Sequence, residues 1–152
     1  MNLFLDTEFV DLIPGSKLIS IALVDENEDF FYAELTDTYT LEDCSPFVKQ
    51  FVLPFLKGDP YRMTWKECQI RIGVWIEERG VDCCIASDNP AWDIPYLNQL
   101  LTTHVWPENL ETSYYPVWVP NEDKERLIIE GDLNIHNALD DAIVMKRFEV
   151  DK

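Results

Sequence analysis

The chain has 152 residues, of which 47% are hydrophobic and 12% aromatic, and this composition excludes a disordered chain. Twelve lysines and arginines stand against 29 aspartates and glutamates, which gives a formal net charge of −17. That charge excludes the broad basic surface with which proteins usually hold long nucleic acids. The length predicts a single domain over residues 1–152, and the charge predicts that any contact with nucleic acid is local or bridged by cations.

The sequence predicts a cytoplasmic protein without a membrane partner. No segment approaches the roughly 20 apolar residues of a transmembrane helix. Asp6 comes too early for the apolar region of a signal peptide. The four cysteines form no CxxC pair, and we expect them to be reduced structural thiols. They are Cys44, Cys68, Cys83 and Cys84.

The beginning of the chain predicts an antiparallel sheet. Strands are expected over residues 2–9, 17–26 and 30–35, where apolar and β-branched side chains gather. The segments PGSK and ENED between them are short and have turn composition. Because short links join antiparallel neighbours, these three strands should form a meander.

Helices are predicted next. Residues 45–56 place apolar side chains at helical spacing, with Pro46 near the start and Pro54 near the end. Residues 64–80 give the clearest helix, because Thr64 and Glu67 form a capping-box pattern and Gly80 is a typical C-terminal stop.

The second half of the chain predicts a short buried strand over residues 81–87, then a turn and a helix up to residue 101. A weaker strand is expected over residues 116–119 and a final helix over 137–148. The region from about 102 to 135 should run over the surface as loops. This order predicts an α/β fold in which helices flank a mixed sheet.

Two carboxylates follow the apolar start of the first strand. Because side chains alternate along a strand, Asp6 and Glu8 should lie on one face, about 6.5 Å apart. Adjacent buried anions repel each other, and a divalent cation with oxygen ligands would neutralise them. The alternative is that the strand runs out into solvent and exposes both acids.

A third acid lies in the segment SDNPAWDIPYL. Since proline fits a helix without penalty only in the first turn, Pro95 places Asp93 at or just before a helix N-terminus. Asp93 is there either a helix cap or part of a charged site, and the two roles are compatible. Asp88 and Asn89 have the character of turn residues.

The last helix begins in the segment HNALDDA. Asn137 is expected to cap it, with Asp140 solvated in the first turn and Asp141 beside the apolar face. His136 precedes the helix, where its side chain can reach over the helix end. His104 has no comparable surroundings and is expected to be an ordinary surface or core residue.

These segments together resemble the DEDDh exonucleases, the family of ribonuclease T, oligoribonuclease and the bacterial proofreading subunits. The resemblance rests on LDTEF, on an aspartate at the start of a central helix and on HNALDDA, and it extends from Asp6 to the final helix. The chain is most similar to the small bacterial and phage 3′–5′ exoribonucleases of this group. The fold implied by the resemblance is ribonuclease H-like.

The resemblance also implies roles for individual residues. Asp6, Glu8, Asp93 and Asp141 would hold two divalent cations, Mg²⁺ or Mn²⁺, and His136 would be the general base. The implied reaction removes nucleoside 5′-monophosphates from the 3′ end of a single strand, with RNA favoured over DNA. Small members of the group often form dimers, so a homodimer is a further expectation.

Phe9 and Trp92 flank the proposed metal-site acids. Each either stacks on a terminal base or packs in the core. Two alternatives to the exoribonuclease stay open. The charge of −17 also suits an acidic inhibitor that mimics nucleic acid, and a metal site alone does not exclude a DNA-directed proofreading exonuclease.

Overall fold

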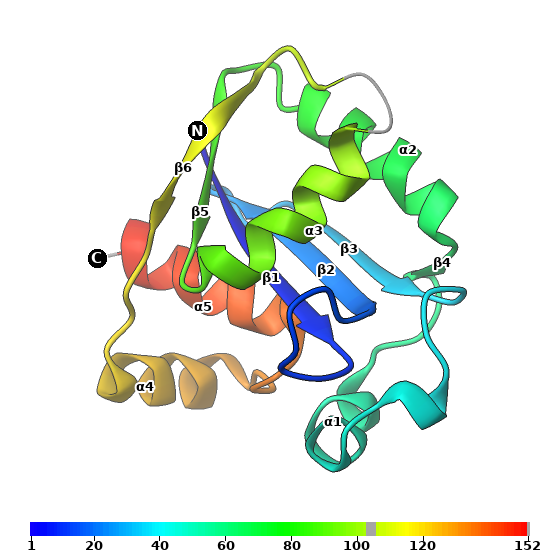
Figure 1. Cartoon of the computed structure of the whole chain (residues 1–152). Helices are drawn as coiled ribbons and strands as arrows, with labels where there is room; N and C mark the ends of the chain where they lie inside the picture. Colours follow the sequence, from blue (N-terminus) through cyan, green and yellow to red (C-terminus); the bar gives the residue numbers. More distant parts are fainter. Residues whose placement is uncertain (103–105, 152) are drawn as a thin grey trace.

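The computed structural model describes residues 1–102 and 106–151. Its centre is a mixed sheet of six strands in the order β4-β3-β2-β1-β5-β6 (Figure 1). The strands are β1 (Asn2–Phe9), β2 (Leu18–Asp25), β3 (Phe30–Leu35), β4 (Arg62–Met63), β5 (Cys83–Ser87) and β6 (Leu110–Pro116). The predicted meander is confirmed, because β1, β2 and β3 pair antiparallel, while β5 lies parallel to β1 on its other side.

Five α-helices accompany the sheet in the described ranges. They are α1 (Pro46–Phe51), α2 (Trp65–Glu77), α3 (Pro90–Thr102), α4 (Asn121–Gly131) and α5 (Ala138–Val150). The hydroxyl of Thr64 accepts a hydrogen bond from the Glu67 N–H, which starts α2 as predicted. The helix predicted over 45–56 is shorter, since α1 passes into a 3₁₀ turn at Leu53–Phe55. The prediction of an α/β fold with a mixed, helix-flanked sheet is confirmed.

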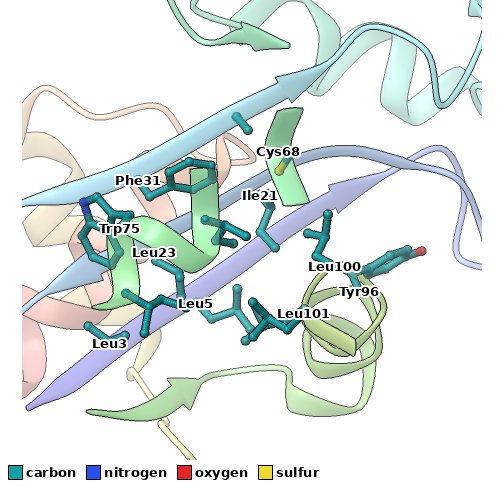
Figure 2. Packing of buried hydrophobic residues seen from close by; sticks show 14 of the residues in the cluster. Leu3, Leu5, Ile21, Leu23, Phe31, Cys68, Trp75, Tyr96, Leu100 and Leu101 are labelled. Atoms are coloured by element: carbon teal, nitrogen blue, oxygen red, sulfur yellow. The ribbon is translucent and has the colours of Figure 1, made fainter. Parts of the chain in front are cut away.

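One face of the sheet carries most of the buried side chains. Figure 2 shows Leu3 and Leu5 of β1 packed with side chains of α2 and α3, among them Trp75 and Leu100. Burying a side chain of this size stabilises the fold by roughly 1.5–3 kcal/mol. This layer fixes α3, and therefore Asp93, against β1.

The opposite face is covered by α5. Phe4 of β1 packs there with Leu139 and Met145. Because side chains alternate along β1, residues 4, 6 and 8 point toward α5 while residues 3, 5 and 7 point toward α2 and α3. The carboxylates of Asp6 and Glu8 therefore lie on the side of the sheet where α5 begins.

The loop predicted over residues 102–135 is wrong in two places. Strand β6 and helix α4 both lie there. Most of β6 is exposed, and in α4 only Leu127 is buried among the described residues, so neither segment shows the apolar period that marks a buried element. The strand predicted at 116–119 begins earlier than expected and ends at Pro116.

Three further expectations concern local features. All four cysteines are free thiols, as predicted. Within the described residues, no helix has both the length and the apolar character needed to cross a bilayer. His104, expected to be an ordinary residue, lies outside the described residues.

Candidate metal centre

The carboxyl end of β1 supplies two half-buried acids to one cleft. Asp6 and Glu8 lie on the α5 side of the strand, as alternation predicts. In Figure 1 the arrowhead of β1 points to the lower edge of the molecule, between α4 and α1. The alternative in which both acids are simply exposed to solvent is wrong, since neither is exposed.

Asp93 reaches the same cleft from α3. It lies in the first turn and is 2% exposed. Its two carboxylate oxygens accept hydrogen bonds from the Thr7 hydroxyl, at 2.6 Å, and from the Ser87 hydroxyl, at 2.5 Å. Asp93 therefore does not use these bonds to cap the helix. They tie its carboxylate to β1 and to the end of β5.

The start of α3 differs from the prediction. The helix begins at Pro90, and Pro95 lies inside it rather than in its first turn. A proline at this position removes the hydrogen bond to the carbonyl of Ala91. Since Ala91 and Pro95 are both exposed, water can satisfy that carbonyl.

The beginning of α5 carries the fourth acid and the histidine. The Asn137 side chain caps the helix, as predicted, by accepting from the N–H groups of Leu139 and Asp140. Asp141 is buried, and its Oδ2 accepts from the His136 N–H at 3.0 Å. His136 has φ of +64°, a left-handed conformation that costs a non-glycine residue about 1–2 kcal/mol. The bond to Asp141 helps to hold it.

The expectation that Asp140 is solvated is wrong. The side chain is buried, and it accepts from Lys57 Nζ at 3.1 Å and from the Asn134 N–H at 2.8 Å. The reason is the loop 53–60, which passes over the helix start and brings Lys57 to it. Asp140 therefore supports the turn that presents His136.

Two sets of possible ligands result from this arrangement. In each set, one ligand atom per residue lies within 4.8 Å of the others. The first set is Glu8, His136 and Asp141, and the second is Asp6, Asp88 and Asp93. The structure thus brings the four predicted metal-site acids and His136 together in one cleft of about 640 Å³, which Asp88 and Lys124 also line.

The two added residues were missed for different reasons. Asp88 was interpreted as a turn residue, although its position directly after β5, at the same end of the sheet as Asp6, was a usable signal. Lys124 belongs to α4, a helix that was not predicted. Without that helix, nothing in the sequence indicates that Lys124 lies near the acids.

The cluster is costly to ionise. Burial and the charges of Asp93 and Asp141 hold the pKa of Asp6 well above its ordinary value. Burial, with the charge of Asp141 next, raises the pKa of Glu8 to about 9. Burial is also the main cause that raises the pKa of Asp93 to about 7 and that of Asp141 to about 6. A bound cation would remove this penalty.

Two buried carboxylate oxygens are available to a ligand. Asp6 Oδ2 and Asp141 Oδ1 are buried and accept no hydrogen bond from the described parts of the chain. Buried polar atoms without a partner are rare in native proteins, and each calls for an explanation. Carboxylate oxygens are the preferred ligands of Mg²⁺ and Mn²⁺, so the donor set fits a hard divalent cation.

The imidazole of His136 faces the cleft in a form suited to accept a proton. Burial, with a smaller contribution from Lys124, lowers the pKa of His136. The ring is therefore neutral near neutral pH and has a free nitrogen. The ring of Phe47 lies edge to face with it, with centroids 5.1 Å apart.

Phe9 and Trp92, the two aromatic residues predicted to flank the site, differ in their position relative to the cleft. Phe9 lines the cleft, and Trp92 is not among the described residues that line it. The rings of Trp92 and Tyr96 stack on Phe9, with centroids 5.2 and 5.6 Å away. Phe47, which the sequence analysis did not select, lines the cleft and is half exposed, so it offers a ring to a ligand.

Comparison of the chain with models of known protein families found no match, and comparison with curated proteins found none either. The functional argument therefore rests on the geometry and chemistry of the cleft.

Proposed function

We propose that the protein is a metal-dependent 3′–5′ exonuclease that acts on single-stranded nucleic acid, with RNA favoured, and releases nucleoside 5′-monophosphates. One observation carries this proposal. Four carboxylates from three separate elements, Asp6 and Glu8 from β1, Asp93 from α3 and Asp141 from α5, converge on one cleft beside His136. A cluster so costly to ionise is explained by a bound cation.

The architecture supports the same proposal. The order β3-β2-β1-β5-β6, with only β2 antiparallel to its neighbours among these strands, is compatible with a ribonuclease H-like fold, and we assign the chain to it. In this assignment the first strand of the sheet supplies the D-x-E acids and the last helix supplies His136 and Asp141. Both places agree with the resemblance to the DEDDh exonucleases.

Hydrolysis of a phosphodiester would give Asp6, Glu8 and His136 separate tasks. Two divalent ions about 3.5–4 Å apart would stabilise the charge that develops on the attacking and leaving oxygens of a phosphodiester. Asp6 belongs to one ligand set and Glu8 to the other. Because both residues lie on β1, this strand would connect the two sets. His136, held by its backbone bond to Asp141, would accept the proton of the attacking water.

The cleft suits a chain end. Its volume of about 640 Å³ lies in the range of sites for small ligands, and it is large enough for a terminal nucleotide. Its lining combines the acids with apolar side chains, among them Leu12, Phe47 and Val52. A net charge of −17 weakens binding to long polyanions, and short single strands are therefore the favoured substrates.

A digestion assay tests the proposal. Single-stranded RNA and DNA of matched sequence, labelled at the 5′ end, are incubated with the protein in Mg²⁺, Mn²⁺ or EDTA. We expect a ladder that shortens from the 3′ end, requires metal and disappears in Asp6→Asn. Asp82→Asn is the matched control, because Asp82 is exposed and precedes the other end of β5.

The same assay separates the alternatives. Degradation of DNA alone would favour a proofreading-type exonuclease. Intact oligonucleotides in every condition, with folded protein, would contradict an exonuclease and favour the acidic nucleic-acid mimic that the charge suggests.

A further inference from the structure

The acid-lined cleft contains one side chain of opposite charge. Among the described residues that line it, Lys124 is the single lysine or arginine. Lys124 lies in the first turn of α4, which packs against α5, so the helix directs this side chain toward Asp141. The other cation of α4, Arg126, pairs with Asp123 and Glu130 on its own helix.

The contact between Lys124 and Asp141 is an ion pair without hydrogen-bond geometry. Lys124 Nζ lies 3.6 Å from Asp141 Oδ1, which is longer than a normal hydrogen bond. The Lys124 side chain is 28% exposed and that of Asp141 is 9% exposed. Asp141 Oδ1 is also one of the two buried oxygens that accept no hydrogen bond from the described residues. The ammonium group therefore partly neutralises this oxygen from a distance beyond that of a normal hydrogen bond.

A metal ion and the ammonium group would compete for the Asp141 carboxylate. Asp141 belongs to the ligand set with Glu8 and His136, and Asp141 and Lys124 both line the cleft. Two cations on one carboxylate repel each other, and this repulsion rises as they approach. A metal held by Asp141 Oδ1 would therefore displace Lys124 Nζ from this oxygen.

In a substrate complex, a phosphate is a suitable partner for the displaced ammonium group. The lysine side chain is long and flexible, and Lys124 lines the cleft. The net charge of the chain is −17, and among the described residues of the cleft no other lysine or arginine is available to a phosphate. Lys124 can supply it without any change in the backbone.

We infer that Lys124 is an exchangeable counter-cation of the centre. It neutralises Asp141 in the metal-free protein, gives way to the divalent ion, and then faces a phosphate of the bound strand. This inference rests on the proposed function, since it needs both a metal site and a phosphate-containing substrate. It adds Lys124 to Phe9 and Trp92, the residues that the sequence predicted as possible contacts of the substrate.

Titration with Mn²⁺ alone tests the first half of the inference. Calorimetry on the full chain after EDTA treatment and dialysis gives the affinity without any substrate. We expect Lys124→Gln to bind Mn²⁺ about tenfold more tightly than the wild type, because the competing charge is gone. Lys124→Arg keeps the charge and should bind Mn²⁺ like the wild type.

Turnover of a short 5′-labelled RNA at saturating Mn²⁺ tests the second half. We expect kcat/KM to fall by about tenfold in Lys124→Gln and to recover in Lys124→Arg. For Lys124→Gln we therefore expect tighter metal binding together with slower turnover. A side chain that merely supports the fold would weaken both. Lys66→Gln, an exposed lysine on α2 outside the cleft, is the control for loss of one charge.

The outcomes separate the inference from the proposed function. If the wild type binds Mn²⁺ and degrades RNA but Lys124→Gln binds Mn²⁺ equally or more weakly, Lys124 is not a competing cation. If its metal binding tightens while turnover is unchanged, Lys124 does not face the phosphate. If the wild type neither binds Mn²⁺ nor degrades RNA, the proposed function fails and the inference fails with it.

Discussion

The His136 side chain has two possible roles at the metal centre, as a ligand or as a general base. Its ring belongs to a possible ligand set with Glu8 and Asp141, and its lowered pKa also suits a general base. The two roles differ in what they do to metal binding. A ligand contributes to affinity, whereas a base contributes to the rate alone.

For His136→Ala we predict that the hydrolysis rate falls by about 10²–10⁴-fold while Mn²⁺ affinity stays within about threefold of the wild type. The rate falls because no other neutral imidazole lines the cleft among the described residues. Calorimetric titration and turnover of one RNA substrate measure the two quantities. A loss of Mn²⁺ binding that matches the loss of rate would instead make His136 a ligand.

The ion pair between Asp140 and Lys57 lies next to the metal centre and supports the turn that presents His136. Removal of Asp140 would leave the Lys57 ammonium group and the Asn134 N–H without their partner. We predict that Asp140→Ala lowers the free energy of unfolding by about 1–3 kcal/mol, as measured by urea denaturation. Lys57→Met should cost less, and the double variant should cost less than the sum of the two. Additive losses would show that the pair does not interact.

At the scale of elements, the start of α5 is held by a buried polar network. The Asn137 amide donates to the Tyr32 hydroxyl at 3.1 Å and to the Phe55 carbonyl at 3.0 Å. The Tyr32 hydroxyl in turn donates to Glu34, whose carboxylate also accepts from two backbone N–H groups of the loop at 57–58. The network joins β3, this loop and α5, so it fixes the helix end from which Asp141 projects.

Helix α1 supplies the aromatic wall of the cleft. Phe47 and Phe51 lie on this helix with ring centroids 5.0 Å apart, but only Phe47 lines the cleft among the described residues. We predict that Phe47→Ala raises KM for a short RNA by roughly 5- to 100-fold, since stacking on one base is worth about 1–3 kcal/mol. Phe51→Ala is the matched control and should leave KM unchanged. Equal effects of the two variants would indicate a general disturbance of α1.

The elements that were predicted correctly share a physical property. Strands β1 to β3 and helix α2 each bury several apolar side chains, and these apolar segments are visible in the sequence. β6 and α4 are mostly exposed and bury few apolar side chains. The difference matters for the site, because the acids lie on or beside predicted elements, whereas Lys124 lies on the helix that was missed. Asp140 was misjudged because its partner, Lys57, comes from a distant loop.

The acid cluster makes the free energy of unfolding of the whole protein depend on pH. The carboxyl groups of Asp141, Asp93 and Glu8 have a pKa of about 6, 7 and 9, each above its ordinary value. The folded protein therefore binds more protons than the unfolded chain between pH 4 and 9, roughly, and its stability falls as the pH rises through this window. A divalent metal would bind the ionised groups and should reverse the trend.

We predict that, in EDTA, Tm falls from pH 5 to pH 9, and that the increase in Tm caused by millimolar Mn²⁺ grows over the same range. Scanning calorimetry at several pH values measures both. Part of the fall in EDTA reflects the net charge of −17, so Asp93→Asn serves as the reference. That variant should lose less stability with rising pH and gain less from Mn²⁺. A wild-type Tm that Mn²⁺ does not change at any pH would argue against a preformed site.

We propose that the carboxylates of β1, α3 and α5 form one metal centre beside His136. Anomalous diffraction from crystals soaked in Mn²⁺ tests this proposal, because the peaks locate the ions without reference to activity. We predict two peaks about 3.5–4 Å apart, both within bonding distance of the carboxylates in the cleft. Peaks confined to surface acids, or no peak in the cleft of a protein that still diffracts well, would contradict it.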